Sequence, residues 1–340
     1  MIERFIENEL TLKRWRRFKS RRTAVFSAFC LLFMTFLTVT AELISNNRPI
    51  VMRYQGELYF PAYRNYHAEA FGITDYLVPD YKEFEFTEPG DFAIWPIIRW
   101  DPNESNIDVD YYPAPPSSVN LLGTDNRGRD VLSRLLYGFR YSMAFAVFVW
   151  LITFITGTIL GGIMGYAGGR IDFFGQRVVE VLSTVPQFFL LIILISIFQP
   201  NLTLLILVSS IFAWIPISYY VRGEFLKNRK KEFVEAALSM GASHTSVIFK
   251  HILPNSLTSV ITFAPFTISM NIIILASLDF LGFGLPVYIP SWGEMLNQAQ
   301  TYATTSWWLA VFPSLALFIT LTFLNLFGEG VRDALDPNFN

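Results

Sequence analysis

The chain has 340 residues, of which 52% are hydrophobic and 16% are charged, and its mean hydropathy is +0.38. A soluble domain of this size carries roughly 25% charged residues, so the composition excludes an ordinary soluble protein. The single cysteine, Cys30, excludes an intramolecular disulfide, and a formal net charge of −2 gives no reason to expect a nucleic-acid partner.

The N-terminal segment, residues 1–23, is strongly basic and precedes an uncharged apolar run, Ala24–Ala41. This run exceeds the roughly 7–15 apolar residues of a cleaved signal peptide, and no small-residue cleavage site follows it, although Ser20-Arg21-Arg22 faintly resembles a twin-arginine signal. We therefore expect a retained transmembrane helix at residues 24–43. The basic residues before it should hold the N-terminus in the cytoplasm.

Residues 44–120 differ from the rest of the chain. They contain twelve Asp or Glu against five Arg or Lys, nine of the eighteen prolines, and many aromatic residues that include Trp95 and Trp100. Disordered segments lack aromatic residues. We therefore expect a small ordered insert of short strands and turns, and its acidic character after the first span places it in the periplasm.

Five further apolar runs are each long enough to cross a bilayer. The loops expected inside, 167–173 and 222–254, and the tail, 328–340, contain arginine or lysine, whereas the two later loops expected outside, 199–201 and 284–306, contain neither. This satisfies the positive-inside rule at every crossing and predicts both termini in the cytoplasm. The expected spans are Tyr141–Tyr166, Phe174–Phe198, Leu202–Val221, Ser256–Phe283 and Trp307–Phe327, within a five-helix core of residues 140–327.

Motifs of common enzyme classes are missing from the sequence. The histidines form no H-E-x-x-H zinc pair, and there is no G-x-S-x-G nucleophile elbow and no G-x-x-x-x-G-K-[ST] phosphate loop. Cys30 lies at expected membrane depth with no histidine near it in the sequence. We therefore expect no catalytic residue, no metal and no bound nucleotide in this chain, and an intramembrane enzyme is the less favoured class.

The longest loop expected in the cytoplasm, 222–254, has the sequence of two short helices bent at a glycine. Lys230–Met240 is rich in helix formers, and glycine, here Gly241, commonly ends a helix. Ser243 can cap a second helix, which we expect to end at Pro254 as the chain re-enters the bilayer. Ala236-Ala237 would give the corner a surface of small side chains. A basic loop that only fixes the topology is the alternative.

The spacing in this loop resembles the EAA motif of permease subunits of ATP-binding cassette (ABC) importers. The shared pattern is Glu-Ala-Ala, three residues, a glycine, and Leu-Pro twelve positions later. In that family the loop forms a coupling helix that docks into a groove of the cytoplasmic ATPase. The resemblance assigns ATPase coupling to Glu235, Ala236, Ala237, Gly241, Leu253 and Pro254.

A second signature lies just before the second span. Thr124 or Asp125 can cap a periplasmic amphipathic helix over residues 121–139, with Asp130 and Arg134 at i and i+4 on its wet side. The stretch also resembles the LGTD-x-x-GRD-x-x-SR sequence of dipeptide and oligopeptide permeases of the DppC/OppC type. Its matching residues are Leu122, Gly123, Thr124, Asp125, Gly128, Arg129, Asp130, Ser133 and Arg134.

Later segments agree with this family: Gly168-Gly169-x-x-Asp172, Leu281-Gly282-Phe283-Gly284 and Pro290-Ser291-Trp292-Gly293. Ordinary members connect the first helix to the LGTD segment by a much shorter stretch than 44–120. This insert, together with Asp279, most resembles the YejE-type branch, which is associated with peptide-like cargo.

Four polar residues of the spans are candidates for a translocation path: Arg177, Glu180, Asn271 and Asp279. Arg177 and Glu180, at i and i+3 near a helix end, can instead pair with each other, and single polar residues such as Asn271 also join helices. Pro186, Pro216 and Pro265 should kink the third, fourth and fifth spans.

The resemblance implies an all-α integral membrane protein with six transmembrane helices, the type I ABC importer permease fold and a small periplasmic insert, located in a bacterial inner membrane. It implies four kinds of partner: a DppB-like second permease, cytoplasmic ATPases that bind the ATP, a periplasmic peptide-binding protein and membrane lipid. The function implied is import of peptides or peptide-like compounds. A permease for nickel or another small solute is the alternative, and a channel or ion-driven transporter would need inverted repeats, which the sequence lacks.

Overall fold

The computed structural model describes residues 9–73 and 77–336, most of which are helical. The outermost parts of the expected cytoplasmic termini, and three residues of the expected insert, lie outside the described residues. The chain divides into two compact units. The first comprises Met1–Leu31, Ser142–Pro286 and Phe318–Asn340, and the second comprises Leu32–Tyr141 and Val287–Leu317.

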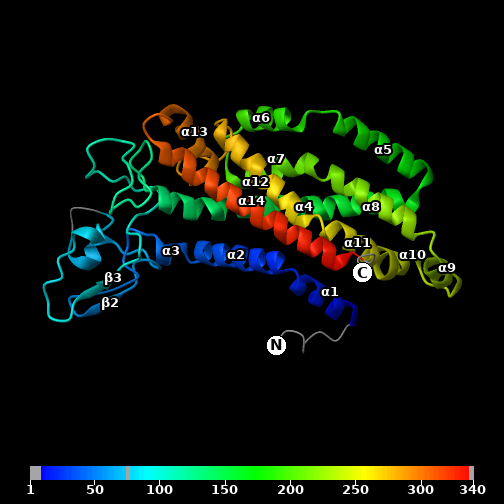
Figure 1. The fold of residues 1–340 in the computed structure, drawn as a ribbon, viewed down its shortest axis with the longest axis horizontal. Coiled ribbons are helices and arrows are strands. Elements are labelled where there is room, and N and C mark those ends of the chain that lie inside the picture. The colour runs from blue at the N-terminus through cyan, green and yellow to red at the C-terminus, as the bar shows by residue number, and fades with distance from the viewer. Residues whose placement is uncertain (1–8, 74–76, 337–340) are drawn as a thin grey trace. The chain divides into compact units, whose positions relative to one another are not determined.

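Within residues 9–73 and 77–336, three helices are long and apolar enough to cross a membrane without a break (Figure 1). Each belongs partly to both units. They are α2 (Arg22–Val39), α4 (Val131–Ala167) and α14 (Trp307–Leu335). Helices of 37 and 29 residues exceed the roughly 20 residues that a bilayer requires. Helix α14 therefore continues through residues 328–335, which were expected to form a tail.

Two pairs of apolar helices, each bent at a short break, are long enough to be further spans if each pair counts as one. Helices α5 (Gly169–Ser183) and α6 (Gln187–Ile197) meet at 72°, with Pro186 capping α6. Helices α7 (Leu202–Ala213) and α8 (Ile215–Asn228) meet at 43°, with Pro216 in the first turn of α8. Proline tolerates the first turn of a helix but not its interior, because it lacks an N–H group.

The last apolar run is divided in the same way. Helix α11 (Leu253–Ile261) ends just before α12 (Ala264–Phe280), whose first turn contains Pro265. The predicted breaks at the three prolines are therefore confirmed. Each of the six expected apolar runs is helical. By length and composition, the described residues contain three unbroken spans, or five spans if each bent pair counts as one. Helix α12 is a shorter apolar helix.

Residues 44–120 belong to the second unit and hold its strands. After α3 (Ala41–Ile44), strands β1 (Val51–Tyr54), β2 (Glu57–Tyr59) and β3 (Phe92–Ile94) form an antiparallel sheet in the order β2-β1-β3. Met52 pairs with Tyr59 on one side and with Ala93 on the other. Two short 3-10 helices, η2 (Ala68–Phe71) and η3 (Tyr81–Glu83), bring Phe71 and Tyr81 into one apolar cluster with Met52.

The amphipathic helix expected over 121–139 is wrong in its first half. Residues 121–130 form turns and single bridges, and α4 begins only at Val131. Asp130 caps this helix, because its Oδ1 accepts a hydrogen bond of 2.7 Å from the Ser133 N–H. Asp125 instead accepts a bond from the Arg127 N–H within the preceding turn, and the Thr124 hydroxyl accepts one from the more distant Ala114 N–H. Residues 131–139, the second half of the expected amphipathic helix, are thus continuous with the membrane span in α4.

The remaining helices lie in the terminal segment and the loops. Helix α1 (Glu9–Ser20) precedes α2, and α13 (Trp292–Tyr302) lies in the loop expected outside. The loop after α8 holds α9 (Glu232–Ser239), α10 (His244–Val247) and η4 (Ile248–Ile252), which is a π-helix that leads into α11.

Candidate functional site

The loop that resembles the coupling helix begins with α9, which is shorter than the expected helix over Lys230–Met240. Gly241 follows the C-cap of α9 with φ of +86°, a conformation that favours glycine, and a Cβ built on it would meet nothing within 4 Å. The Ser243 hydroxyl then accepts a bond from the Ser246 N–H and caps α10, as predicted. The bend at Gly241 thus presents an open corner.

Pro254 does not end the second helix, contrary to expectation. The chain stays helical from α10 through η4 into α11, and Pro254 lies in the first turn of α11. In η4 the Leu253 N–H donates to the Ile248 carbonyl, five residues earlier. This wider turn accommodates the proline, which has no N–H and would clash with a regular α-helical turn before it.

The two faces of α9 have different environments. Val234 and Ala237 are buried, whereas Glu235 and Ala236 are exposed. The expectation that both alanines form an outer surface is therefore wrong for Ala237. At helical spacing, residues 234 and 237 share one face, and that face packs inward.

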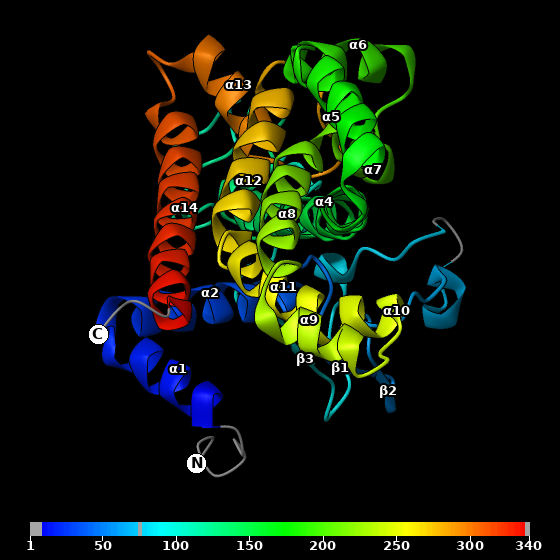
Figure 2. The ribbon, with the colours of Figure 1, turned by 90° about the vertical axis from the view of Figure 1, so that its right-hand side faces the viewer.

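The buried face of α9 belongs to an apolar cluster of the first unit. Val234 and Ala237 lie in this cluster with residues of α8, α10, η4 and α11, and Leu253 packs against it. Figure 2 shows α9 and α10 beside α11. The buried cluster members are Ile217, Val221, Phe225, Val234, Ala237, Val247, Ile252 and Val260. The inner face of α9 is thus packed against α8 and α11.

The outer face of the same loop exposes large apolar side chains. Met240 is 83% exposed beside Gly241, and Phe249 of η4 is 63% exposed. Phe233 and Leu238 of α9 are also exposed.

Polar contacts join this loop to α4 and join α5 to α8. The Tyr166 hydroxyl lies 2.5 Å from Nδ1 of His244, and Arg229 donates a bond of 2.9 Å to the Tyr166 carbonyl. Arg222 of α8 pairs with the Asp172 carboxylate through two of its nitrogens. The Gly168-Gly169-x-x-Asp172 segment is thus held against α8.

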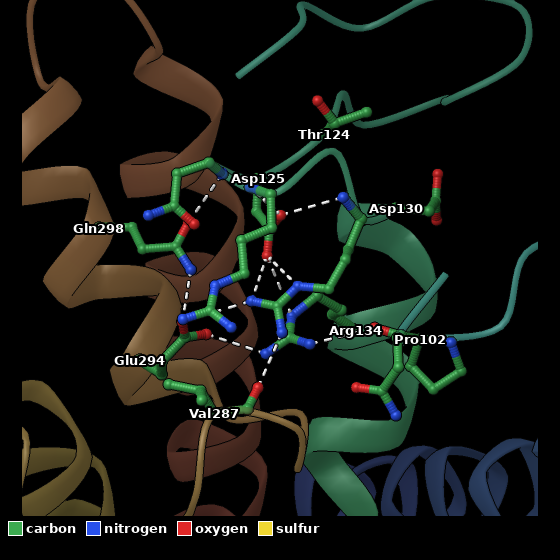
Figure 3. Close-up of polar contacts among 12 residues, drawn as sticks. Pro102, Thr124, Asp125, Asp130, Arg134, Val287, Glu294 and Gln298 are labelled. Carbon is green, nitrogen blue, oxygen red and sulfur yellow. Dashed lines mark hydrogen bonds and ion pairs between the residues drawn. The ribbon is translucent and has the colours of Figure 1, made fainter. Parts of the chain in front are cut away.

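The LGTD signature forms a buried charge network in the second unit (Figure 3). Asp125 accepts two bonds from the Arg129 side chain, at 2.7 and 2.6 Å, and two from backbone N–H groups. Arg134 is completely buried; it pairs with Glu294 at 2.9 Å and donates to the Pro102 carbonyl at 3.0 Å. Arg129 also reaches the Val287 carbonyl.

These contacts overturn the expectation that Asp130 and Arg134 face water. Both are buried. Asp130 Oδ2 accepts a bond of 2.9 Å from Asn120, while its Oδ1 caps α4. Burial raises the pKa of Asp130, and the bonds from Asn120 and the Ser133 N–H act in the opposite direction. The i, i+4 spacing is real, but the insert covers the helix at this point.

The backbone of the signature is fixed by residues distant in sequence. Gly123 has φ of +80°, and a Cβ there would lie within 3 Å of Trp308 and the Ala114 carbonyl. Thr124 exchanges bonds with Ala114 through N–H and hydroxyl, and the Thr124 carbonyl accepts from the Trp308 indole. The other signature residues lie in the same turn or at the start of α4: Leu122 half-buried, and Gly128 and Ser133 buried.

Two partners of this network were not predicted. Glu294 bonds Arg134, and Gln298 bonds both Glu294 and the Asn126 N–H. The available signal was the Ser-x-x-Glu pattern at Ser291, which caps α13 with a bond from the Glu294 N–H. That pattern predicts where the helix begins, but it does not predict which arginine pairs with the Glu294 carboxylate.

A cavity of about 440 Å³ lies in the first unit, between α4, α6, α7 and α12. Its wall is mainly apolar, with Phe145, Phe188 and Phe212 among its members. Four polar residues also line it: Gln187, Ser209, Asn271 and Ser277. A mostly apolar wall with a few polar groups is typical of sites for organic ligands.

Of the four path candidates, Asn271 alone is among the residues that line this cavity, and its side chain donates a bond of 3.1 Å to the Ala146 carbonyl. Arg177 and Glu180 form an exposed ion pair at 2.6 Å on α5. Asp279 is buried at the end of α12 and accepts a bond of 2.6 Å from the Leu285 N–H. The structure therefore does not bring the four together.

Comparisons with known proteins agree with this architecture. Residues 157–340 match the family described as "Binding-protein-dependent transport system inner membrane component", and residues 12–61 match "N-terminal TM domain of oligopeptide transport permease C". The chain is 40% identical over 331 residues to "Inner membrane ABC transporter permease protein YejE" of Escherichia coli K12, covering 96% of each chain. It is 35% identical over 356 residues to "Peptidoglycan transport system permease protein YejE" of Agrobacterium fabrum, covering 96% of this chain and 93% of that one.

A solved structure shares the fold. An inward-facing structure of the MetNI methionine ABC transporter superposes with a TM-score of 0.50 at 18% identity, covering 59% of this chain and 96% of that chain. Fold and loop define a permease of the type I ABC importer class. The chain belongs to the family of binding-protein-dependent transport system inner membrane components, and within it resembles the YejE permeases. It is thus a multi-pass inner-membrane transport protein and not an enzyme, and it works with an ATPase and a substrate-binding protein.

Proposed function

We propose that this chain forms one half of a pore that imports peptides or peptide-like compounds from the periplasm. The match of residues 12–61 to an oligopeptide permease domain and the likeness to a peptidoglycan transport permease support this class of cargo. The mainly apolar cavity with four polar residues suits an organic solute better than a nickel ion, which is the alternative cargo.

The arrangement of α9 is the observation that carries the coupling role. One face of α9 packs into the cluster with α8 and α11, and the other face is exposed around Glu235, Ala236 and Gly241. Because one face of α9 is exposed and the other is packed against α8 and α11, a partner bound to the exposed face could transmit force through α9 to the spans. The partner would be the ATPase, which binds the ATP.

The proposed cycle follows from this linkage. When the ATPases close, their groove displaces α9, and the packed cluster carries α8 and α11 with it. Rigid-body motion of helices then exposes the cavity beside Asn271 to alternate sides of the membrane. If this chain forms one half of the pore, a second permease must form the other half, and we propose that it is DppB-like. We also propose that both termini of this chain lie in the cytoplasm.

The experiment compares Gly241→Asp with Gly241→Asn in the assembled importer. Both side chains tolerate the left-handed conformation, so the variants differ mainly in charge. We expect Gly241→Asp to abolish peptide uptake and ATPase co-purification while membrane insertion stays normal, and Gly241→Asn to retain both in part. Ala236→Trp, on the exposed face, should behave as Gly241→Asp does. Normal uptake by Gly241→Asp and Ala236→Trp would overturn the assignment.

A further inference from the structure

A basic groove lies in the first unit between α1, α8, α11 and α14, with a volume of about 440 Å³. Four cationic side chains from separate parts of the chain line it: Arg14, Lys227, Lys231 and Arg332. Two carboxylates, Glu224 and Asp336, also line it, so its ionisable side chains carry a surplus of two positive charges. A groove of this kind attracts a small anion.

Neutral polar residues of α11 also line the groove. Asn255 and Thr258 line it one helical turn apart, and their side chains bond backbone carbonyls of the preceding turn. Lysine and arginine donate charge-assisted hydrogen bonds to phosphate oxygens. The groove therefore matches the chemistry of a phosphate ester.

An apolar strip continues from the groove. Phe263 lines the groove and packs against the Tyr220 ring with their centroids 4.9 Å apart, and both side chains are exposed. Inorganic phosphate has no apolar part that could contact this strip, whereas the acyl chains of a lipid can pack along it. The ligand that fits both parts is amphipathic.

Helix α1 provides independent support for a membrane ligand. It carries five basic residues in twelve, together with Trp15 and Phe18, directly before the apolar helix α2. Basic segments next to a span bind anionic headgroups, and aromatic residues anchor at the interface. We propose that the groove binds the phosphodiester headgroup of an anionic phospholipid, with an acyl chain along Phe263 and Tyr220.

The lipid would lie beside the segment that joins α8 to α9, because Lys227 is in the last turn of α8 and Lys231 is the residue before α9. Its binding does not depend on the coupling role proposed above, and it can be measured without transport. Bound lipid would add an anchor at the start of the coupling loop.

Native mass spectrometry of the full-length chain in detergent, titrated with phosphatidylglycerol, tests the site. The double variant Lys227→Gln/Lys231→Gln removes two groove charges, and we expect a loss of affinity on the order of 30-fold. Lys230→Gln/Lys250→Gln removes the same charge from exposed positions of the same loop that do not line the groove, and it should bind as the wild type does. Phosphatidylcholine should bind no better to the wild type than to the groove variant.

Millimolar inorganic phosphate distinguishes the two sources of the anion. We expect it to leave phosphatidylglycerol binding unchanged, and displacement of the lipid would overturn the proposal in favour of a free-anion site. An equal loss in both double variants would overturn it in favour of unspecific charge attraction. If the double variant is not monodisperse in gel filtration, Lys227→Gln alone should still weaken binding about fivefold, and an unchanged affinity would contradict the site.

Discussion

The hydroxyl of Tyr166, in the last turn of α4, lies 2.5 Å from Nδ1 of His244, the first residue of α10. Arg229 reaches the Tyr166 carbonyl from the segment between α8 and α9, so the same turn of α4 is held from both sides of α9. The apolar cluster joins α9 to α8 and α11, and these two bonds extend the linkage to α4. Displacement of the loop would therefore move three helices together.

Tyr166→Phe removes this hydroxyl and keeps the ring. We expect peptide uptake by reconstituted importer to fall about fivefold, as loss of one hydrogen bond allows, while ATP hydrolysis continues. The ratio of peptide transported to ATP hydrolysed in proteoliposomes measures the effect. Tyr219→Phe, at an exposed tyrosine of α8, is the matched control. A Tyr166→Phe importer that couples as well as the control would show that the contact transmits nothing.

The Arg134–Glu294 pair supports a prediction about stability. Glu294→Leu removes the closer of the two carboxylates beside the completely buried Arg134 and leaves only Asp125, 3.5 Å away, so we expect a loss of up to about 3 kcal/mol, the scale for breaking a buried pair. Thermal unfolding in detergent should show this loss, whereas Glu88→Leu, at an exposed glutamate, should change little. The double variant Arg134→Met/Glu294→Leu should recover part of the loss, because it also removes the buried charge that lost its closer partner. A double variant as unstable as the sum of its parts would contradict the pairing.

The apolar helices and their breaks were predictable from the sequence, whereas the long-range contacts of the buried charges were not. Absence of charge over twenty residues predicted the apolar helices, and proline chemistry predicted the breaks at Pro186, Pro216 and Pro265. Helical spacing alone predicted that Arg134 is exposed to solvent, which is wrong. Spacing cannot predict the contact with Glu294, whose carboxylate lies 160 residues away in the sequence. It also ended a helix at Pro254, because a π-helical turn has no simple sequence signal.

The Glu42–Arg140 pair supports a prediction about pH. Arg140 donates bonds of 2.7 and 2.9 Å to the two carboxylate oxygens of Glu42, which lowers the pKa of Glu42 below its usual 4.5. A lowered folded-state pKa adds stability above the unfolded value, and this stability is lost as the pH falls through the folded value. Glu42 is partly exposed, so solvent screening limits the effect to about 0.5 kcal/mol. Wild type should therefore unfold later than Glu42→Gln at pH 7, and the two should converge below pH 4.5. A gap that persists unchanged at the lower pH would contradict this.

The cavity between α4, α6, α7 and α12 supports a prediction about cargo. Gln187 lines it, and Gln187→Leu removes a polar group from the wall at similar volume. If peptide passes here, the variant should change the apparent KM for peptide uptake by about three- to tenfold, the range expected for one hydrogen bond to cargo. ATPase co-purification should remain normal, because the coupling loop is untouched. Gln176→Leu, on α5 and not among the residues of the cavity wall, is the control.

Because a change in helix packing would also alter thermal stability, a KM shift at unchanged stability separates contact with cargo from a structural effect. Equal KM values for the two variants would place the peptide path elsewhere.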